Sequence, residues 1–355
     1  MQTANDLLYD VETQIMENIV TFLSRGSVAS ADWQISRLEA YGALNTENRK
    51  VIERFKGKVG TLSQAEVREA MKSALDEIEP QFLKAKAAGA SLLDALPPNA
   101  SPALREMLAS YQGRAVQGMN YTMQTLLENA GGVYIQSVNK ASLLILSGSY
   151  SIDDAIAQTV REWSKSGIPS IVDRAGKQWS TEAYAQMVMR STVRSVTTDT
   201  QFTRCDEYGT DLIEISSHVD AREGCAPYQG KVYSRSGQTK GYPLLSSTSY
   251  GEPAGIFGVN CRHTAYPYFP GLSTKTFPAR KFDEEAYANS QKQRLYERGV
   301  RQSKREIAVM EKTKDTMAVE QARKTLSRRE DRLKEFLSET NRTRRSTREL
   351  IYDVL

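Results

Sequence analysis

Both histidines and two of the three cysteines of this 355-residue chain fall in two short stretches. His218 and Cys225 lie in SSHVDAREGCAPYQGKVYS, residues 216–234, and Cys261 and His263 lie in GVNCRH, residues 258–263. Thiolate and imidazole are ligands from which proteins build tetrahedral zinc sites, and a closed site of this kind contributes folding energy to a small module. One hypothesis is therefore a single structural zinc held by these four side chains.

The spacing of the four residues leaves a second interpretation open. Six residues separate His218 from Cys225, whereas familiar zinc loops place their ligands two to four residues apart. Cys261 and His263 are two positions apart, so on an extended segment both side chains point to the same side. The alternative is that the cysteines are buried as small hydrophobic residues and that the histidines bond to loop carbonyls.

No catalytic motif accompanies these residues. His218 with either cysteine would make a thiolate–imidazole pair, but HVDARE lacks the order of two histidines four apart with a glutamate between them. The stretch GIFGVN lacks the Lys-Ser/Thr that completes a phosphate-binding loop, and no nucleophile elbow is present in the sequence. The sequence therefore assigns no reaction, and a zinc-dependent enzyme is kept only as the alternative.

Composition limits the class of protein. The chain has 47 basic and 43 acidic residues and is 40% hydrophobic, which indicates a globular protein without a strong overall charge. An odd number of cysteines in so long a chain indicates a reducing compartment rather than a disulfide framework. The N-terminus has no export signal, and the most apolar run, SLLILSGSYS, is too short for a membrane segment.

The first 200 residues have the periodicity of helices. An apolar stripe at three- and four-residue steps predicts a helix that ends near Gly26; it consists of Leu7, Leu8, Val11, Ile15, Ile19, Val20 and Leu23. Ser63 and Glu66 match a capping box, which predicts a new helix from there towards Pro80. The stretch LPPNASP, residues 96–102, predicts a linker, and the glycine pair at residues 131–132 predicts a break in the helix that follows.

The pattern changes in the second half of the chain. Ser180 as N-cap and Gly209 as C-terminal residue delimit a long predicted helix, and alternation in DLIEISSH predicts a half-buried strand over residues 212–215. A loop-rich stretch follows, and helical periodicity returns from residue 283. The expected fold is mainly α with a small α+β module. Three regions are expected: helical residues 1–178, the module over residues 179–282, and a basic helical tail over residues 283–355.

The C-terminal region carries excess positive charge. Residues 283–345 contain 17 basic and 12 acidic residues, and the arginines concentrate in NRTRRSTREL, residues 341–350. This excess makes Arg342, Arg344 and Arg345 candidates for contact with DNA phosphates. The alternative is a solvated helix face, on which pairs of opposite charge are common. A freely soluble DNA-binding regulator is disfavoured, because no helix-turn-helix or zinc-finger spacing is present.

Three stretches in order resemble a known family. GIPSIVDRAGKQWSTEAYAQMVMRSTVRS, then DEYGTDLIEISSHVDAREGCAPYQGKVYS, then GIFGVNCRHTAYPYFPG are similar to the phage minor capsid protein family related to the F-type head morphogenesis protein of phage Mu. A helix containing SQKQRLYERGVRQSKRE, residues 290–306, follows these stretches, and the resemblance covers about residues 167–350. Within it, the residues that match the family motif are Arg222, Gln229, Gly230, Lys231, Asn260 and Arg262.

The resemblance implies a structural rather than a catalytic role. It implies a minor head component associated with the portal vertex of a tailed phage, acting in head assembly and in DNA packaging or delivery. The implied partners are the portal protein, other capsid proteins and packaged double-stranded DNA, with no small-molecule substrate. The implied location is the virion, inside the capsid near the portal, after assembly in the host cytoplasm.

The resemblance also bears on the metal hypothesis. Related F-type proteins carry a Cys-x-x-Cys pair and a later Cys-Arg-Cys. Cys225 and Cys261 match the first cysteine of each, whereas Tyr228 and His263 stand at the second positions. The family pattern therefore does not give this chain four cysteine ligands, and His218 is the residue expected to complete the shell.

Overall fold

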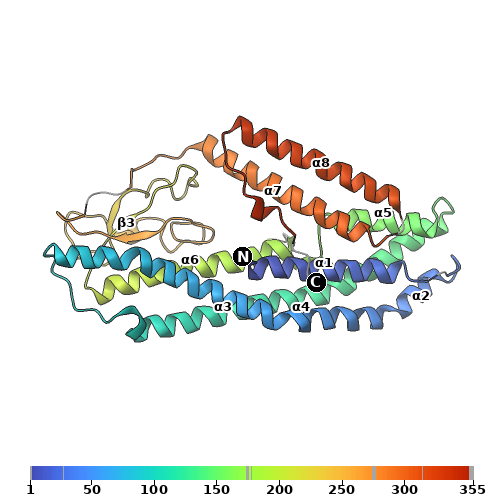
Figure 1. Cartoon of the computed structure of the whole chain (residues 1–355), viewed down its shortest axis with the longest axis horizontal. Coiled ribbons are helices and arrows are strands. Elements are labelled where there is room, and N and C mark those ends of the chain that lie inside the picture. Colours follow the sequence, from blue (N-terminus) through green and yellow to red (C-terminus); the bar gives the residue numbers. More distant parts are fainter. Residues whose placement is uncertain are drawn as a thin grey trace. The chain divides into compact units, whose positions relative to one another are not determined.

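A computed structural model describes residues 2–26, 28–172, 176, 178–273, 277–313 and 315–351, and its helices dominate the fold (Figure 1). The mainly α architecture with a small α+β part is confirmed. The α-helices are α1 (Ala4–Leu23), α2 (Trp33–Glu39), α3 (Tyr41–Ala87), α4 (Pro102–Leu146), α5 (Ile152–Ser164), α6 (Thr181–Glu207), α7 (Glu284–Met310) and α8 (Thr316–Glu339). Short 3-10 turns occupy Pro98–Ala100, Leu245–Ser247 and Ser346–Arg348.

The chain divides into two compact units that are discontinuous in sequence. Unit 1 consists of residues 1–61, 118–186 and 291–355, and unit 2 consists of residues 62–117 and 187–290. Helices α3, α4, α6 and α7 contribute residues to both units. The stretches GCAPYQGK and GVNCRH both lie in unit 2.

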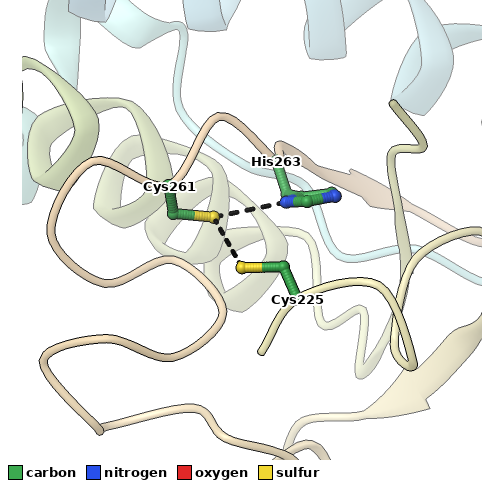
Figure 2. Close-up of side chains that lie close together, drawn as sticks. All are labelled: Cys225, Cys261 and His263. Carbon is green, nitrogen blue, oxygen red and sulfur yellow. Dashed lines mark hydrogen bonds between the residues drawn. The ribbon is translucent and has the colours of Figure 1, made fainter. Parts of the chain in front are cut away.

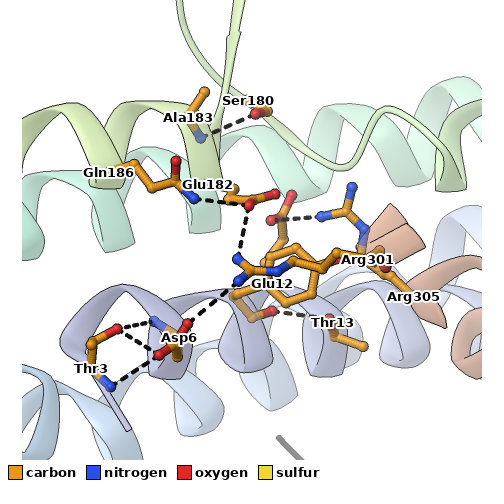
Figure 3. Close-up of polar contacts among 11 residues, drawn as sticks. Thr3, Asp6, Glu12, Thr13, Ser180, Glu182, Ala183, Gln186, Arg301 and Arg305 are labelled. Carbon is orange, nitrogen blue, oxygen red and sulfur yellow. Dashed lines mark hydrogen bonds and ion pairs between the residues drawn. The ribbon is translucent and has the colours of Figure 1, made fainter. Parts of the chain in front are cut away.

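Most residues of helix α1 are buried in unit 1. Thr3 and Asp6 form a capping box at its start, in which each side chain accepts a hydrogen bond from the other's backbone N–H (Figure 3). All seven residues of the predicted apolar stripe are buried, which confirms the stripe. Because α1 also buries Tyr9 and Glu12 on another face, it is enclosed on more than one side.

Buried ion pairs hold α7 to α1 within unit 1. The Nη1 atom of Arg305 lies 3.0 Å from the Oε2 atom of Glu12, and the other carboxylate oxygen of Glu12 accepts the backbone N–H of Ile168 at 2.8 Å. Arg301 pairs with Glu182 at 2.9 Å and with Asp6 at 3.7 Å (Figure 3). These charges are nearly inaccessible, so removing one partner leaves an uncompensated buried charge.

Two predicted helix boundaries are wrong. Helix α3 runs without interruption through Ser63 and Pro80, and Ser63 is fully buried inside it. Helix α4 continues through Gly131, where an added Cβ atom would lie 2.5 Å from the hydroxyl oxygen of Tyr41. The glycine therefore permits close packing of Tyr41 rather than ending the helix, and tertiary packing overrides the local sequence signals.

Helix α6 and strand β3 (Leu212–Ile215) confirm the predicted order of helix, turn and strand in this region. The Oγ atom of Ser180 accepts the backbone N–H of Ala183 at 3.2 Å, and Gly209 adopts φ +70° after the helix end. The half-buried alternation predicted for residues 212–215 is wrong, because all four residues of β3 are buried. Glu214 is buried as well, and its Oε1 atom accepts the backbone N–H of Phe277 at 3.1 Å.

Strand β3 is the centre of a three-stranded antiparallel sheet in unit 2. The order is β4-β3-β5, with β4 at Val232–Ser234 and β5 at Ala265–Pro267. A separate two-stranded antiparallel pair, β1 (Pro169–Val172) and β2 (Gln178–Ser180), lies in unit 1. A hydrophobic core joins the sheet to the α3 and α6 residues of unit 2, and it includes Ile78, Phe82, Tyr208, Cys225 and Cys261.

Helices α7 and α8 pack against each other in unit 1 through Val300, Leu333, Phe336 and Leu337. The Nη1 atom of Arg329 on α8 donates to the Gly299 carbonyl at 2.6 Å and to the Ser303 hydroxyl at 2.9 Å. The predicted return to helix after residue 283 is confirmed. Among the residues that the structure describes, no helix is both long and apolar enough to span a membrane.

Candidate metal centre

A short turn after strand β3 positions Cys225. The backbone N–H groups of Cys225 and Ala226 both donate to the Arg222 carbonyl, at 2.9 and 3.0 Å. The Arg222 guanidinium then donates to the sulfur of Cys225 at 3.2 Å, and to the carbonyls of Gly255 at 2.7 Å and Val259 at 3.0 Å. Arg222 therefore ties the turn that carries Cys225 to the loop that leads into Cys261.

The loop before Cys261 is tightly folded. A Cβ atom added at Gly255 would lie 1.7 Å from the Ser249 carbonyl oxygen, and one at Gly258 would lie 2.6 Å from two carbonyl oxygens. Phe257 and Asn260 both adopt φ 59°, a region that is uncommon for a bulky residue such as Phe257. The Cys261 N–H donates to the Gly258 carbonyl at 3.0 Å. The path of this loop therefore fixes where the Cys261 side chain points.

Cys225, Cys261 and His263 converge from these two stretches (Figure 2). The two Sγ atoms are 3.9 Å apart, and the Cys261 Sγ atom is 3.4 Å from the His263 Nδ1 atom. Ordinary Zn–S and Zn–N bonds in a tetrahedral shell place two sulfurs about 3.8 Å apart, and a sulfur and a nitrogen about 3.6 Å apart. All three residues are buried and both thiols are free, so the cluster has the donor set and spacing of a zinc site.

Gln229 orients the His263 ring. The Oε1 atom of Gln229 accepts the backbone N–H of His218 at 2.8 Å, a group that can only donate. The same oxygen lies 3.1 Å from His263 Nε2, so that nitrogen carries a proton and donates it. The Nδ1 atom of the ring then faces the Cys261 sulfur, and a proton or a metal ion can lie between the two atoms.

The two thiols differ in acidity. The hydrogen bond between them lowers the pKa of Cys261, against the effect of its burial, and the bond to His263 lowers it further. The same hydrogen bond, together with burial, raises the pKa of Cys225. The thiolate form is therefore favoured at Cys261, whereas Cys225 would have to lose its proton for zinc to bind.

His218 lies next to this cluster. Its ring centroid is 4.9 Å from that of His263, and its Nε2 atom is 3.0 Å from the Arg262 carbonyl oxygen. Burial lowers the pKa of His218, and the neighbouring His263 lowers it further. Among the described residues, the group whose ligand atoms all lie within 4.8 Å of one another contains the other three residues and not His218.

The remaining motif residues have structural positions around the cluster. Gly230 adopts φ +63°, and a Cβ atom there would lie 2.4 Å from the Pro278 carbonyl oxygen, so glycine is required on both grounds. Arg262 forms an ion pair with Asp220, while the side chains of Lys231 and Asn260 are exposed. The contacts that Arg222 and Gln229 make could not be predicted from the sequence, because both depend on how distant loops approach each other.

The arginines proposed to contact DNA lie in the segment after α8. The Nε atom of Arg342 donates to Gln293 at 2.7 Å, and Arg344 makes two hydrogen bonds to Glu349, at 2.9 and 2.6 Å. Arg345 also has an interaction within the chain. These residues therefore help to fasten the segment after α8, whatever they contact outside the chain.

The fold is mainly helical and includes a small loop module with a buried cysteine–histidine cluster, and comparison with known proteins shows the family to which the chain belongs. The model of the family described as phage minor capsid protein 2 matches residues 1–338. The chain therefore belongs to this family and is a structural component of a phage particle, with other capsid proteins as its partners.

Two curated relatives agree with this assignment. A structural protein of Lactococcus phage LL-H is 30% identical over 302 residues, which cover 80% of this chain and 79% of the relative. A structural protein of Lactococcus phage mv4 is 33% identical over 118 residues, which cover 32% of this chain and 94% of the relative. No solved structure matches the chain.

Proposed function

We propose that this protein is a minor head component at the portal vertex, acting in head assembly and in DNA packaging or delivery. The observation that supports the proposal most strongly is the match to the minor capsid family across residues 1–338. The resemblance of the module to F-type head morphogenesis proteins adds the portal vertex and the packaged DNA. The protein would act inside the capsid, after assembly in the host cytoplasm.

A phage with the gene removed tests the role in assembly and delivery. We expect heads that either fail to fill with DNA or fill and do not deliver it, measured as DNA content per particle and as infectivity per particle. Supplying the protein from a plasmid should restore both quantities. Normal filling and normal infectivity without the protein would exclude the proposed role.

Within the module, we propose one structural zinc held by Cys225, Cys261, His263 and His218. The rings of two histidines on one tetrahedral zinc have centroids about 5 Å apart, close to the 4.9 Å between His218 and His263. His218 would complete the shell by turning its Nε2 atom from the Arg262 carbonyl to the ion. A zinc in this position would join the loop before Cys261 to the turn at Cys225.

The alternative is a zinc-dependent enzyme carried in the virion. One observation favours it: three ligands converge while His218 bonds elsewhere, and three protein ligands with an open position are typical of catalytic zinc. The burial of all three ligands favours the structural role, because a substrate must reach the ion. X-ray absorption on the zinc-loaded protein distinguishes them, since a coordinated water indicates the open site and two sulfurs with two nitrogens the closed one.

We also propose that the tail contacts double-stranded DNA. Point substitutions test this contact better than a truncation of the tail. Removing everything after residue 283 would remove Arg305 and leave the Glu12 carboxylate buried without its partner, so unit 1 would be destabilised. We expect Arg342→Gln/Arg345→Gln to weaken DNA binding and to reduce its salt dependence. The control is Arg323→Gln/Lys324→Gln on α8, which removes the same charge. Equal effects of both pairs would contradict a specific tail contact.

A further inference from the structure

Unit 1 contains a cleft that the proposed function does not use. It has a volume of about 420 Å³ and lies between the first turns of α6, the middle of α7 and the middle of α8. Its lining includes Arg298, Arg329 and Arg332, and an apolar part formed by Ala183, Leu295 and Tyr296. Clefts of this size bind small ligands or single anchoring side chains of a partner.

The three arginines give the cleft a positive potential. Arg329 is held in place by its bonds to Gly299 and Ser303. Arg298 and Arg332 are exposed, and within the described parts of the chain neither forms an ion pair or a hydrogen bond. The one carboxylate in the lining, Glu182, is already paired with Arg301 at 2.9 Å and accepts from Gln186 at 3.0 Å. Two guanidinium groups therefore remain available for an anion.

The apolar part of the lining indicates what kind of anion fits. Leu295 is 57% exposed in the cleft and, together with Ala183 and Tyr296, offers an apolar surface that a ligand can cover. An isolated phosphate would leave this surface exposed to water. A peptide segment that combines carboxylates with a leucine-like side chain would satisfy the arginines and cover Leu295 together.

Duplex DNA fits the cleft less well. Its phosphates lie on the outside of a stiff rod that cannot enter a recess between three helices. Helix α8 also has a nearly balanced surface, with six basic and five acidic residues, so it lacks the continuous positive face that DNA binding requires. We propose that the cleft formed by α6, α7 and α8 binds an acidic, leucine-containing segment of another virion protein.

The proposal rests on the membership of the chain in a capsid protein family, but its test is independent of location in the particle. Binding of a labelled peptide of repeating Glu-Glu-Leu to the full-length protein is measured by fluorescence anisotropy, beside a Gln-Gln-Leu peptide and a short duplex DNA. We expect only the acidic peptide to bind in the cleft. Arg298→Gln/Arg332→Gln should weaken that binding by about tenfold or more, because charge-assisted hydrogen bonds are lost.

The matched control is Arg323→Gln/Lys324→Gln, which removes two charges from α8 more than one helical turn away from Arg329 and Arg332. It should leave peptide binding within about twofold of wild type, since exposed distant charges are screened. Equal weakening by both pairs, or binding of the Gln-Gln-Leu peptide with similar affinity, would overturn the proposal. Displacement of the acidic peptide by duplex DNA from wild-type protein but not from the Arg298→Gln/Arg332→Gln protein would replace it with a DNA site.

Discussion

At the scale of single residues, substitution of Cys261 and substitution of Cys205 should differ in their effect on metal binding. Cys261→Ala removes a proposed ligand, so we expect loss of bound zinc and a lower melting temperature for the module. Cys205→Ala is the control, because Cys205 is equally buried but lies outside the cluster. The Cys205→Ala protein should lose about 1 kcal/mol of stability and should still bind zinc. Metal content by elemental analysis and melting by calorimetry check both expectations, and a Cys261→Ala protein that retains zinc would contradict the ligand assignment.

Gln229 should raise the zinc affinity of the cluster without being a zinc ligand itself. Gln229→Met removes the oxygen that holds the proton on His263 Nε2, so the ring loses the orientation that aims Nδ1 at Cys261. We expect zinc affinity, measured by competition with a chelator, to fall by about 10–100-fold. Gln238→Met changes an exposed glutamine of the same module and should leave affinity unchanged. An unchanged affinity in Gln229→Met would show that the tautomer is set in another way.

At the scale of elements, the loop before Cys261 depends on glycine at one position and not at another. Gly255→Ala would push a methyl group against the Ser249 carbonyl, so the loop must move, and we expect destabilisation of more than about 2 kcal/mol. At Gly224 the nearest atom to an added Cβ is 3.5 Å away, so Gly224→Ala should change stability by less than about 0.5 kcal/mol. Urea denaturation compares the two, and equal midpoints would show that the loop path is not constrained as described.

The turn after β4 depends on an ionised Asp211. Burial opposes the carboxylate, but hydrogen bonds from Ser234, Thr239 and Ser236 outweigh it and hold the pKa of Asp211 below its ordinary value. A lowered pKa stabilises the fold above the pKa of the unfolded chain, about 4, and this contribution is lost as pH falls below it. Asp211→Asn should therefore cost about 1–2 kcal/mol at neutral pH and progressively less in acid. A difference from wild type that grows in acid would contradict this account.

Elements with strong local signals could be predicted from the sequence, and those decided by distant contacts could not. The capped start of α6 and its Gly209 end depend on neighbouring residues, and both were predicted correctly. The capping box at Ser63 and the break at Gly131 were predicted wrongly, because burial of Ser63 and packing of Tyr41 against Gly131 override the local preference. The same distinction applies to the site: residue types indicated a cluster, but only the fold shows that His218 turns to the Arg262 carbonyl.

At the scale of the whole molecule, the proposed metal site and the proposed peptide-binding cleft lie in different compact units. Unit 2 carries the loop module and its cysteine–histidine cluster, while unit 1 carries the arginine cleft and the segment after α8. The helices that contribute to both units are continuous, so sequence position alone does not separate these parts. Membership in a minor capsid family makes both units components of a phage particle.

An asymmetric cryo-electron microscopy reconstruction of mature particles would show where the protein lies in the particle. The reconstruction is compared with one of particles that lack the gene. We expect difference density at a single vertex, on the inner side next to the portal, into which the helices of the two units can be fitted. Difference density spread over the capsid lattice, or on its outer surface, would contradict the account.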